Sequence, residues 1–219
     1  MAKAQGKAAW FTYFPEDYRW SASITMVLSA AQWGGSDIGE VDIVGRRLRK
    51  KLGDDRHWFR EWTRMGDRVR ALGMAEERKG HALSAASHHK RACVYYQIGD
   101  RFRQPKDKKA MDAFRKSIDC FRRHLRLTDR PRTEEVAIPI EGGKKLPAYL
   151  VHAENTRKSK PPVVVLFDGL DTTKELVYIR AADGLIRRGM SCLFVDGPGT
   201  GGAIRFQKSY LRYDYEVAG

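Results

Sequence analysis

Two apolar runs separated by one amphipathic helix constrain the fold of this chain most. The runs VVVLFD (residues 163–168) and SCLFVD (residues 191–196) are apolar at nearly every position, which is typical of strands covered on both faces. Residues 173–190 between them carry apolar side chains at helical spacing, namely Leu176, Ile179, Ala182, Leu185 and Ile186. A strand, a helix and a second strand in this order predict a right-handed crossover in a parallel sheet. The C-terminal part therefore has the pattern of an α/β fold.

A β-hairpin is predicted immediately before this unit. The segments TEEVAIPIE and KLPAYLVHA have the composition of strands and flank the pair Gly142-Gly143. Glycines in that place favour a tight turn between antiparallel strands. The polar segment ENTRKSKPP then connects the hairpin to the first apolar run.

The first 131 residues have helical periodicity instead. Four segments, over residues 35–53, 54–73, 75–102 and 106–127, each place apolar side chains on one face. These are Ile38, Val41, Val44 and Leu48; Trp58, Trp62, Met65, Val69 and Leu72; Leu83, Ala86, Ala92, Val94 and Tyr95; and Met111, Phe114, Ile118, Phe121 and Leu125. Pro131 ends this pattern. We therefore expect a helical segment over residues 1–131 and an α/β segment over residues 132–219.

The composition excludes several classes of protein. The net charge is +14 and lies mostly in the first 131 residues, where the charges have the spacing of solvated helix faces. No DNA- or RNA-binding motif accompanies them, so we do not expect a nucleic-acid partner. No apolar run is long enough for a membrane span or placed as in a signal peptide. Three scattered cysteines (Cys93, Cys120 and Cys192) are typical of buried thiols in a cytoplasmic protein and predict neither disulfides nor a metal site.

The turn after the first apolar run is the strongest candidate for chemistry. The strand ends at Asp168-Gly169-Leu170-Asp171, and open α/β sheets bind ligands at the carboxyl ends of their strands. Gly169 permits a sharp turn, after which the N–H of Leu170 would point into the cleft. This geometry suits an oxyanion hole. An ordinary turn, with Asp171 or Thr172 capping the next helix, is the alternative.

Other motifs are weaker. Residues 197–202 match G-x-G-x-x-G, but Pro198 sits inside the turn and AIRFQKSY does not begin as a tight helix, which argues against a dinucleotide site. GGSDIG lacks the second glycine of a nucleophile elbow, and Ser36 or Asp37 there predicts a helix cap. His88 and His89 are adjacent and face different sides of a helix. Trp58 and Trp62 have the spacing of core residues, and lining an aromatic substrate pocket is their alternative role.

These segments together resemble a group of α/β-hydrolases. The stretches EEVAIPIEGGKKLPAYLVHA, PPVVVLFDGLDTTKE and RGMSCLFVDGPGTGG are similar to the group that includes 2,6-dihydroxypseudooxynicotine hydrolase, fungal polyketide-shortening hydrolases and FrsA-like esterases. The pairing of GLDTTKE after one strand with DGPGTG after the next is fairly specific. WFREWTRMGDRVRALG and RACVYYQIGDRF resemble the group's helical cap.

The resemblance implies a mechanism for the whole hydrolase. A serine on a nucleophile elbow, a histidine and an acidic residue would cleave an ester, or a C–C bond of a β-diketone-like small molecule, without a metal or organic cofactor. Leu170 would supply an oxyanion N–H, with Gly169 and Asp171 beside the substrate. The loop of residues 196–199 would be structural. The resemblance also implies a possible homodimer formed through the helical half, and the sequence itself does not decide this.

The catalytic serine is expected on a later strand, beyond Tyr215-Glu216. RFQKSYLRYDYEVAG has the pattern of a helix beginning, so we expect this chain to be the front portion of a longer α/β protein, inactive alone. The alternative is a basic helical interaction module on a degenerate α/β scaffold that binds an acidic partner.

Overall fold

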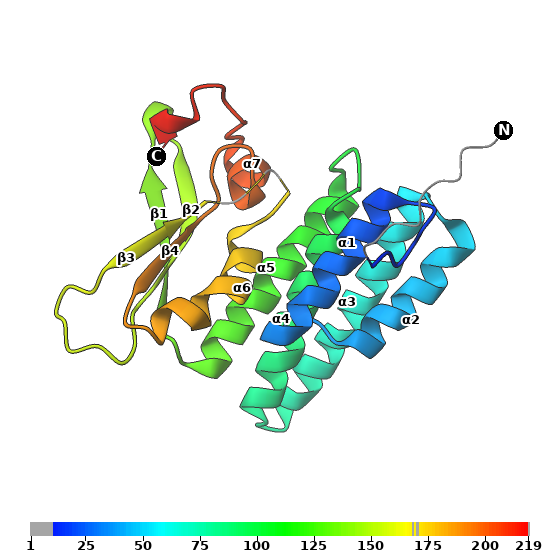
Figure 1. Cartoon of the computed structure of the whole chain (residues 1–219), viewed down its shortest axis with the longest axis horizontal. Coiled ribbons are helices and arrows are strands. Elements are labelled where there is room, and N and C mark those ends of the chain that lie inside the picture. The colour runs from blue at the N-terminus through cyan, green and yellow to red at the C-terminus, as the bar shows by residue number, and fades with distance from the viewer. Residues whose placement is uncertain (1–10, 168, 170, 219) are drawn as a thin grey trace.

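The helical part of the molecule is an array of packed helix hairpins. The computed structural model describes residues 11–167, 169 and 171–218. Within the first part of this range, five α-helices lie side by side (Figure 1). Of these, α4 packs against α3 on one side and α5 on the other. The bounds are α1 Tyr18–Ser29, α2 Ile38–Leu48, α3 Asp55–Arg78, α4 Ala82–Asp100 and α5 Lys108–Thr128.

Aspartates fix where four of these helices begin. The side chains of Asp17, Asp37, Asp54 and Asp107 accept hydrogen bonds from backbone N–H groups in the first turns of α1, α2, α3 and α5. These N–H groups have no partner within the helix, so each cap stabilises its helix by about 1 kcal/mol. The predicted cap before α2 is thus Asp37, whereas the Ser36 hydroxyl donates to the Val27 carbonyl at 2.6 Å.

The boundary between α3 and α4 differs from the prediction. We expected a break at Gly73, but α3 continues through Arg78, and Gly80 (φ +78°) makes the turn. Gly73 serves close packing instead, because a Cβ there would lie 2.8 Å from Cε1 of His89. Leu83, at the start of α4, is 74% exposed and does not face the core. The pattern also did not predict α1.

The second part is a small mixed sheet. Its strands are β1 Thr133–Pro139, β2 Lys145–Val151, β3 Val163–Leu166 and β4 Ser191–Val195, in the order β1-β2-β4-β3. The predicted hairpin is confirmed, since β1 and β2 pair antiparallel around Gly142 and Gly143, both at φ +71°. The predicted parallel strand–helix–strand unit is confirmed as well, since β3 and β4 are parallel and are joined through helix α6 (Lys174–Ile186).

The two faces of the sheet are covered by different elements. On β2, Tyr149 and Val151 join the large core with α5 and α6, which lie between the sheet and the other helices of the helical part in Figure 1. Leu146 and Ala148, on the opposite face, pack with Ala203 of α7 (Gly201–Gln207). This alternation follows from the two-residue period of a strand.

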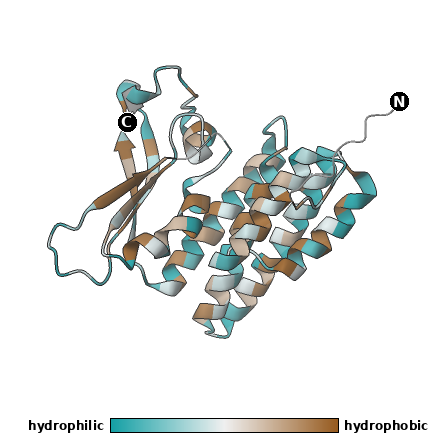
Figure 2. Cartoon of the chain, in the orientation of Figure 1, coloured by the Kyte–Doolittle hydropathy of each residue, from teal (hydrophilic) through white to brown (hydrophobic). Residues whose placement is uncertain are grey.

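One strand is less buried than its sequence suggests. Val163 and Val165 of β3 are 52% and 53% exposed, so the expectation that this run is covered on both faces is wrong. The reason is position, because β3 lies at one end of the strand order. Figure 2 shows it as a hydrophobic strand at that edge.

The C-terminal residues also depart from the prediction. The helix expected to begin in RFQKSYLRYDYEVAG is absent over residues 208–214, because α7 ends at Gln207 and Lys208 takes a left-handed conformation (φ +50°). A 3-10 turn, η4, follows at Tyr215–Ala218. All three cysteines are free and buried. No helix in the described part of the chain is both long and apolar enough to cross a membrane.

Candidate active site

A cavity of about 580 Å³ opens where the loops after β3 and β4 meet the helical part. Its walls come from the end of α4, the α4–α5 connection, the first half of α5, the loops after β3 and β4, the start of α6, and α7. The site therefore lies at the carboxyl ends of the two parallel strands, where open α/β sheets bind ligands. Its volume suits a small organic molecule.

Charged side chains form one part of the cavity wall. Asp100, at the end of α4, pairs with Arg205 of α7 and lies 3.2 Å from Lys106 Nζ. Arg101 pairs with Asp171 on the loop after β3. These contacts connect the helical part to the loop after β3 and to α7. The apolar part of the wall is formed by Met111, Phe114, Leu176 and Ile204.

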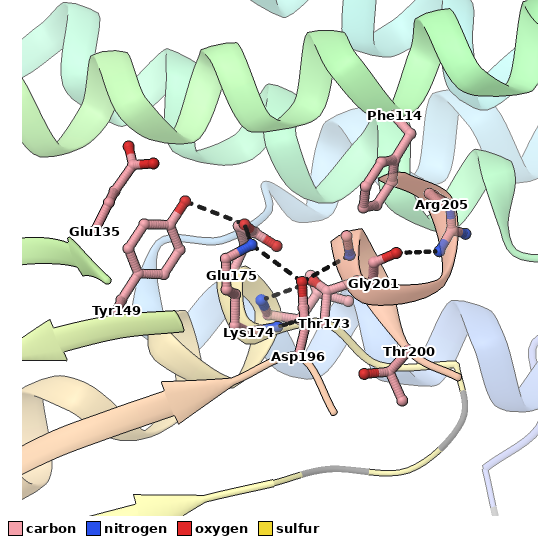
Figure 3. Close-up of polar contacts among 12 residues, drawn as sticks. Phe114, Glu135, Tyr149, Thr173, Lys174, Glu175, Asp196, Thr200, Gly201 and Arg205 are labelled. Carbon is pink, nitrogen blue, oxygen red and sulfur yellow. Dashed lines mark hydrogen bonds and ion pairs between the residues drawn. The ribbon is translucent and has the colours of Figure 1, made fainter. Parts of the chain in front are cut away.

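A buried charge network lies at the start of α6, next to the cavity (Figure 3). Lys174 Nζ is 2.5 Å from Glu175 Oε1 and 3.1 Å from Asp196 Oδ2. The two Asp196 oxygens also accept hydrogen bonds from the backbone N–H of Lys174 at 2.8 Å and of Gly202 at 2.7 Å. A single buried carboxylate thus ties the start of α6, which follows the loop after β3, to the loop after β4.

The same network reaches the helical part through Gln97 of α4. The Gln97 amide donates to Glu175 Oε2 at 3.3 Å, and its oxygen accepts from the Thr173 hydroxyl at 2.6 Å. The Tyr149 hydroxyl of β2 donates to Glu175 Oε1 at 3.1 Å. Side chains from α4, from β2 and from the start of α6 are therefore hydrogen-bonded to one another beside the cavity.

The electrostatics of the network favour an ionised lysine. Burial by itself would lower the pKa of Lys174, but the carboxylates of Asp196 and Glu175 outweigh burial and raise that pKa. Burial raises the pKa of Asp196, whereas in Glu175 the Lys174 ammonium outweighs burial and lowers the pKa. Lys174 is thus held as an ammonium by its two carboxylate neighbours.

The structure places the residues predicted around the turn as follows. Asp171 lines the cavity, and Gly169 accepts a hydrogen bond from the Thr172 N–H at 3.1 Å. Leu170, predicted to supply the oxyanion N–H, lies outside the described residues. The cap of α6 is Thr173, whose hydroxyl accepts from the Leu176 N–H, and not Asp171 or Thr172.

The two tryptophans proposed for an aromatic pocket lie in the core of the helical part. Trp58 and Trp62 have no exposed surface, and neither lines the cavity. Trp58 Nε1 donates to the Ile98 carbonyl at 2.7 Å, and its ring lies 4.9 Å from that of Trp20. Their position agrees with the core interpretation and gives the pocket interpretation no support.

The glycine-rich loop after β4 folds around Asp196. A Cβ on Gly201 would lie 2.2 Å from the Asp196 carboxyl carbon, so only glycine fits there. The Gly202 N–H already donates to that carboxylate. A dinucleotide loop needs free N–H groups facing a phosphate, whereas this loop encloses an internal anion. The geometry favours a structural role for the loop.

Sequence reasoning missed most of the network. Lys174 and Glu175 have the appearance of an ordinary exposed first turn, and Gln97 carries no motif. Asp196 directly follows a buried strand, and this position is the signal that could have pointed to it. Among the described residues, no group of three or more His, Cys, Asp or Glu side chains is arranged to hold a metal ion.

Comparison with known proteins agrees with this architecture. A solved 2,6-dihydroxy-pseudo-oxynicotine hydrolase matches the fold with a TM-score of 0.66 and 20% identity, over 87% of this chain and 50% of the other. The hydrolase LUC6 of Fusarium sp is 33% identical over 196 residues, which cover 87% of this chain and 46% of the relative. The α/β-hydrolase xenA of Xenoacremonium sinensis is 29% identical over 94% of this chain and 48% of its own length.

The chain spans about half the length of these curated relatives. The model of the esterase FrsA-like family matches residues 50–211, a range that includes helices α3 to α5 and the strands β1 to β4. The helical region and the mixed sheet are what the resemblance implied for the front portion of such an enzyme. The chain therefore belongs to the FrsA-like esterase family of α/β-hydrolases.

Proposed function

We propose that this chain forms the cap and the first strands of a serine α/β-hydrolase that cleaves an ester, or a C–C bond of a β-diketone-like small molecule. The observation that carries the proposal is the cavity at the carboxyl ends of β3 and β4, roofed by the end of α4 and the α4–α5 connection. Family membership supports the reaction class, and the relatives quoted above are named hydrolases.

In the proposed reaction, the loop after β3 stabilises developing negative charge. A serine Oγ attacks the substrate carbonyl carbon, the carbonyl π electrons move to oxygen, and a histidine takes the serine proton. The N–H of Leu170 would donate to the resulting oxyanion. Asp171 and Thr172, which follow Leu170 in the sequence, line the cavity. Their position supports the proposal that the reacting carbonyl lies in this cavity.

The attacking serine would come from residues that this sequence does not include. None of the ten serines lies in a G-x-S-x-G sequence, and the chain spans about half of its curated relatives. A nucleophile elbow also requires a strand followed by a sharp turn and a helix. The loops after β3 and β4, which have that context, contain no serine before α6 or α7.

A hydrolysis assay tests this proposal. We expect the purified 219-residue chain to release p-nitrophenol from p-nitrophenyl butyrate no faster than the same chain unfolded in urea. A longer product of the same reading frame that adds a G-x-S-x-G strand should show turnover, lost on replacing that serine by alanine. Turnover by the folded 219-residue chain alone would contradict the proposal.

A further inference from the structure

The cavity has an excess of positive charge. The positively charged lining residues are Arg101, Lys106, Arg205 and Lys208, and the negatively charged ones are Asp100 and Asp171. Arg101 and Asp171 pair with one another. Lys106 and Arg205 both converge on the single carboxylate of Asp100, which leaves that cluster with one unbalanced cation.

This cluster is sheltered from solvent. The side chains of Arg205 and Lys106 are 16% and 27% exposed, and that of Asp100 is 2% exposed. Burial lowers the pKa of Lys106, with Asp100 opposing this effect and Arg205 adding to it. Charges in such surroundings are weakly screened, so an anion entering the cavity would be attracted more strongly than at the open surface.

Arg205 is held in a fixed orientation (Figure 3). Its guanidinium carbon lies 4.2 Å above the ring of Phe114, and Nη1 donates to the Gly201 carbonyl at 3.2 Å. Lys106 is fixed likewise, since Nζ donates to the Asp100 carbonyl at 2.5 Å. Donors that are already positioned lose little conformational entropy when they bind a ligand.

The cavity also has an apolar part of its wall. Met111, Phe114, Leu176 and Ile204 line the same cavity. A ligand that satisfies both kinds of wall has an apolar or aromatic body and one acidic group.

We propose that the substrate of this site carries a carboxylate, which the Arg205–Lys106 cluster binds while the apolar walls hold the rest of the molecule. This proposal adds a substrate class to the proposed hydrolase function. It rests on that function, because the bound molecule is a substrate only if the enzyme cleaves it. The binding preference itself can be measured in the 219-residue chain, in which no hydrolysis is expected.

Calorimetric titration with a matched pair of ligands tests the proposal. The probes are 4-oxo-4-phenylbutanoate and 4-oxo-4-phenylbutanamide, which share shape and differ in charge. We expect the acid to bind the chain about tenfold more tightly than the amide, as one charge-assisted contact would give. R205Q should weaken binding of the acid about tenfold and leave the amide unchanged, whereas R205K should retain the preference for the acid.

The matched control is R187Q, which removes one positive charge from an exposed site on the C-terminal turn of α6, paired with Asp183. It should leave both affinities unchanged. Circular dichroism verifies that each variant is folded, and K106Q replaces R205Q if the latter is not. Equal affinity for acid and amide, no binding of the acid, or the same loss in R187Q as in R205Q would overturn the proposal. None of these results depends on the outcome of the hydrolysis assay.

Discussion

At the scale of single residues, the charge network at the start of α6 is the most consequential feature. Lys174, Glu175 and Asp196 are almost entirely buried, and removing water from three charges is costly unless every charge is paired. Here the ammonium contacts both carboxylates, and backbone N–H groups satisfy Asp196. The network holds the loops after β3 and β4 together, so its integrity sets the shape of the proposed active site.

Replacing the lysine of this network should destabilise the protein strongly. K174M removes the ammonium and leaves two buried carboxylates without their counter-ion, and we expect the free energy of unfolding to fall by about 3–5 kcal/mol at neutral pH. K116M is the matched control, because Lys116 pairs with Asp67 at 2.6 Å but is 41% exposed. That change should cost less than about 1 kcal/mol. Urea unfolding of both variants measures the difference, and equal losses would refute the role assigned to the network.

At the scale of elements, the sequence predicted the elements whose signals lie within their own residues. Gly142 and Gly143 predicted the hairpin, and the spacing of apolar residues over 173–190 predicted α6. Both signals lie within the element itself. The break between α3 and α4 was misplaced because Gly73 and Gly80 look alike in sequence. The packing of His89 against Gly73 and the left-handed conformation of Gly80 distinguish them.

Features that depend on distant partners could not be predicted. The exposure of Val163 and Val165 follows from the place of β3 in the strand order, which a single strand does not encode. Lys174 meets Asp196 across 22 residues of sequence, and Gln97 meets Glu175 across 78. The turn after β3, which the sequence singled out, does border the cavity through Asp171 and Thr172, whereas the side chains of the charge network were not predicted.

The edge of the sheet gives a prediction at this scale. An apolar edge strand tends to pair with other chains, and a lysine on it opposes such pairing. We expect V165K to reduce self-association of the 219-residue chain in sedimentation velocity, with a change in unfolding free energy of only about 0.5 kcal/mol because Val165 is 53% exposed. L83K, at a 74% exposed position on α4, is the control. Unchanged association in V165K, or an equal decrease in L83K, would show that β3 is not the contact.

At the scale of the whole molecule, the helical part and the sheet share one core. The ring of Phe121 on α5 lies 5.3 Å from that of Tyr149 on β2 and 5.1 Å from that of Tyr178 on α6. The cavity takes its walls from both parts, with Asp100 at the end of α4 and Arg205 of α7 joined by an ion pair. The helical part is thus packed onto the segments that follow β3 and β4, and in the proposed hydrolase this packing would exclude water from the reacting carbonyl.

The central claim is that this chain shapes a hydrolase active site while the attacking serine lies elsewhere. Mass spectrometry after treatment with a fluorophosphonate, which reacts with activated serines, tests it most directly. We predict no labelled serine in the folded 219-residue chain and one labelled serine in a longer, active product of the reading frame, outside residues 1–219. Stoichiometric labelling of any of the ten serines in residues 1–219 would contradict this claim.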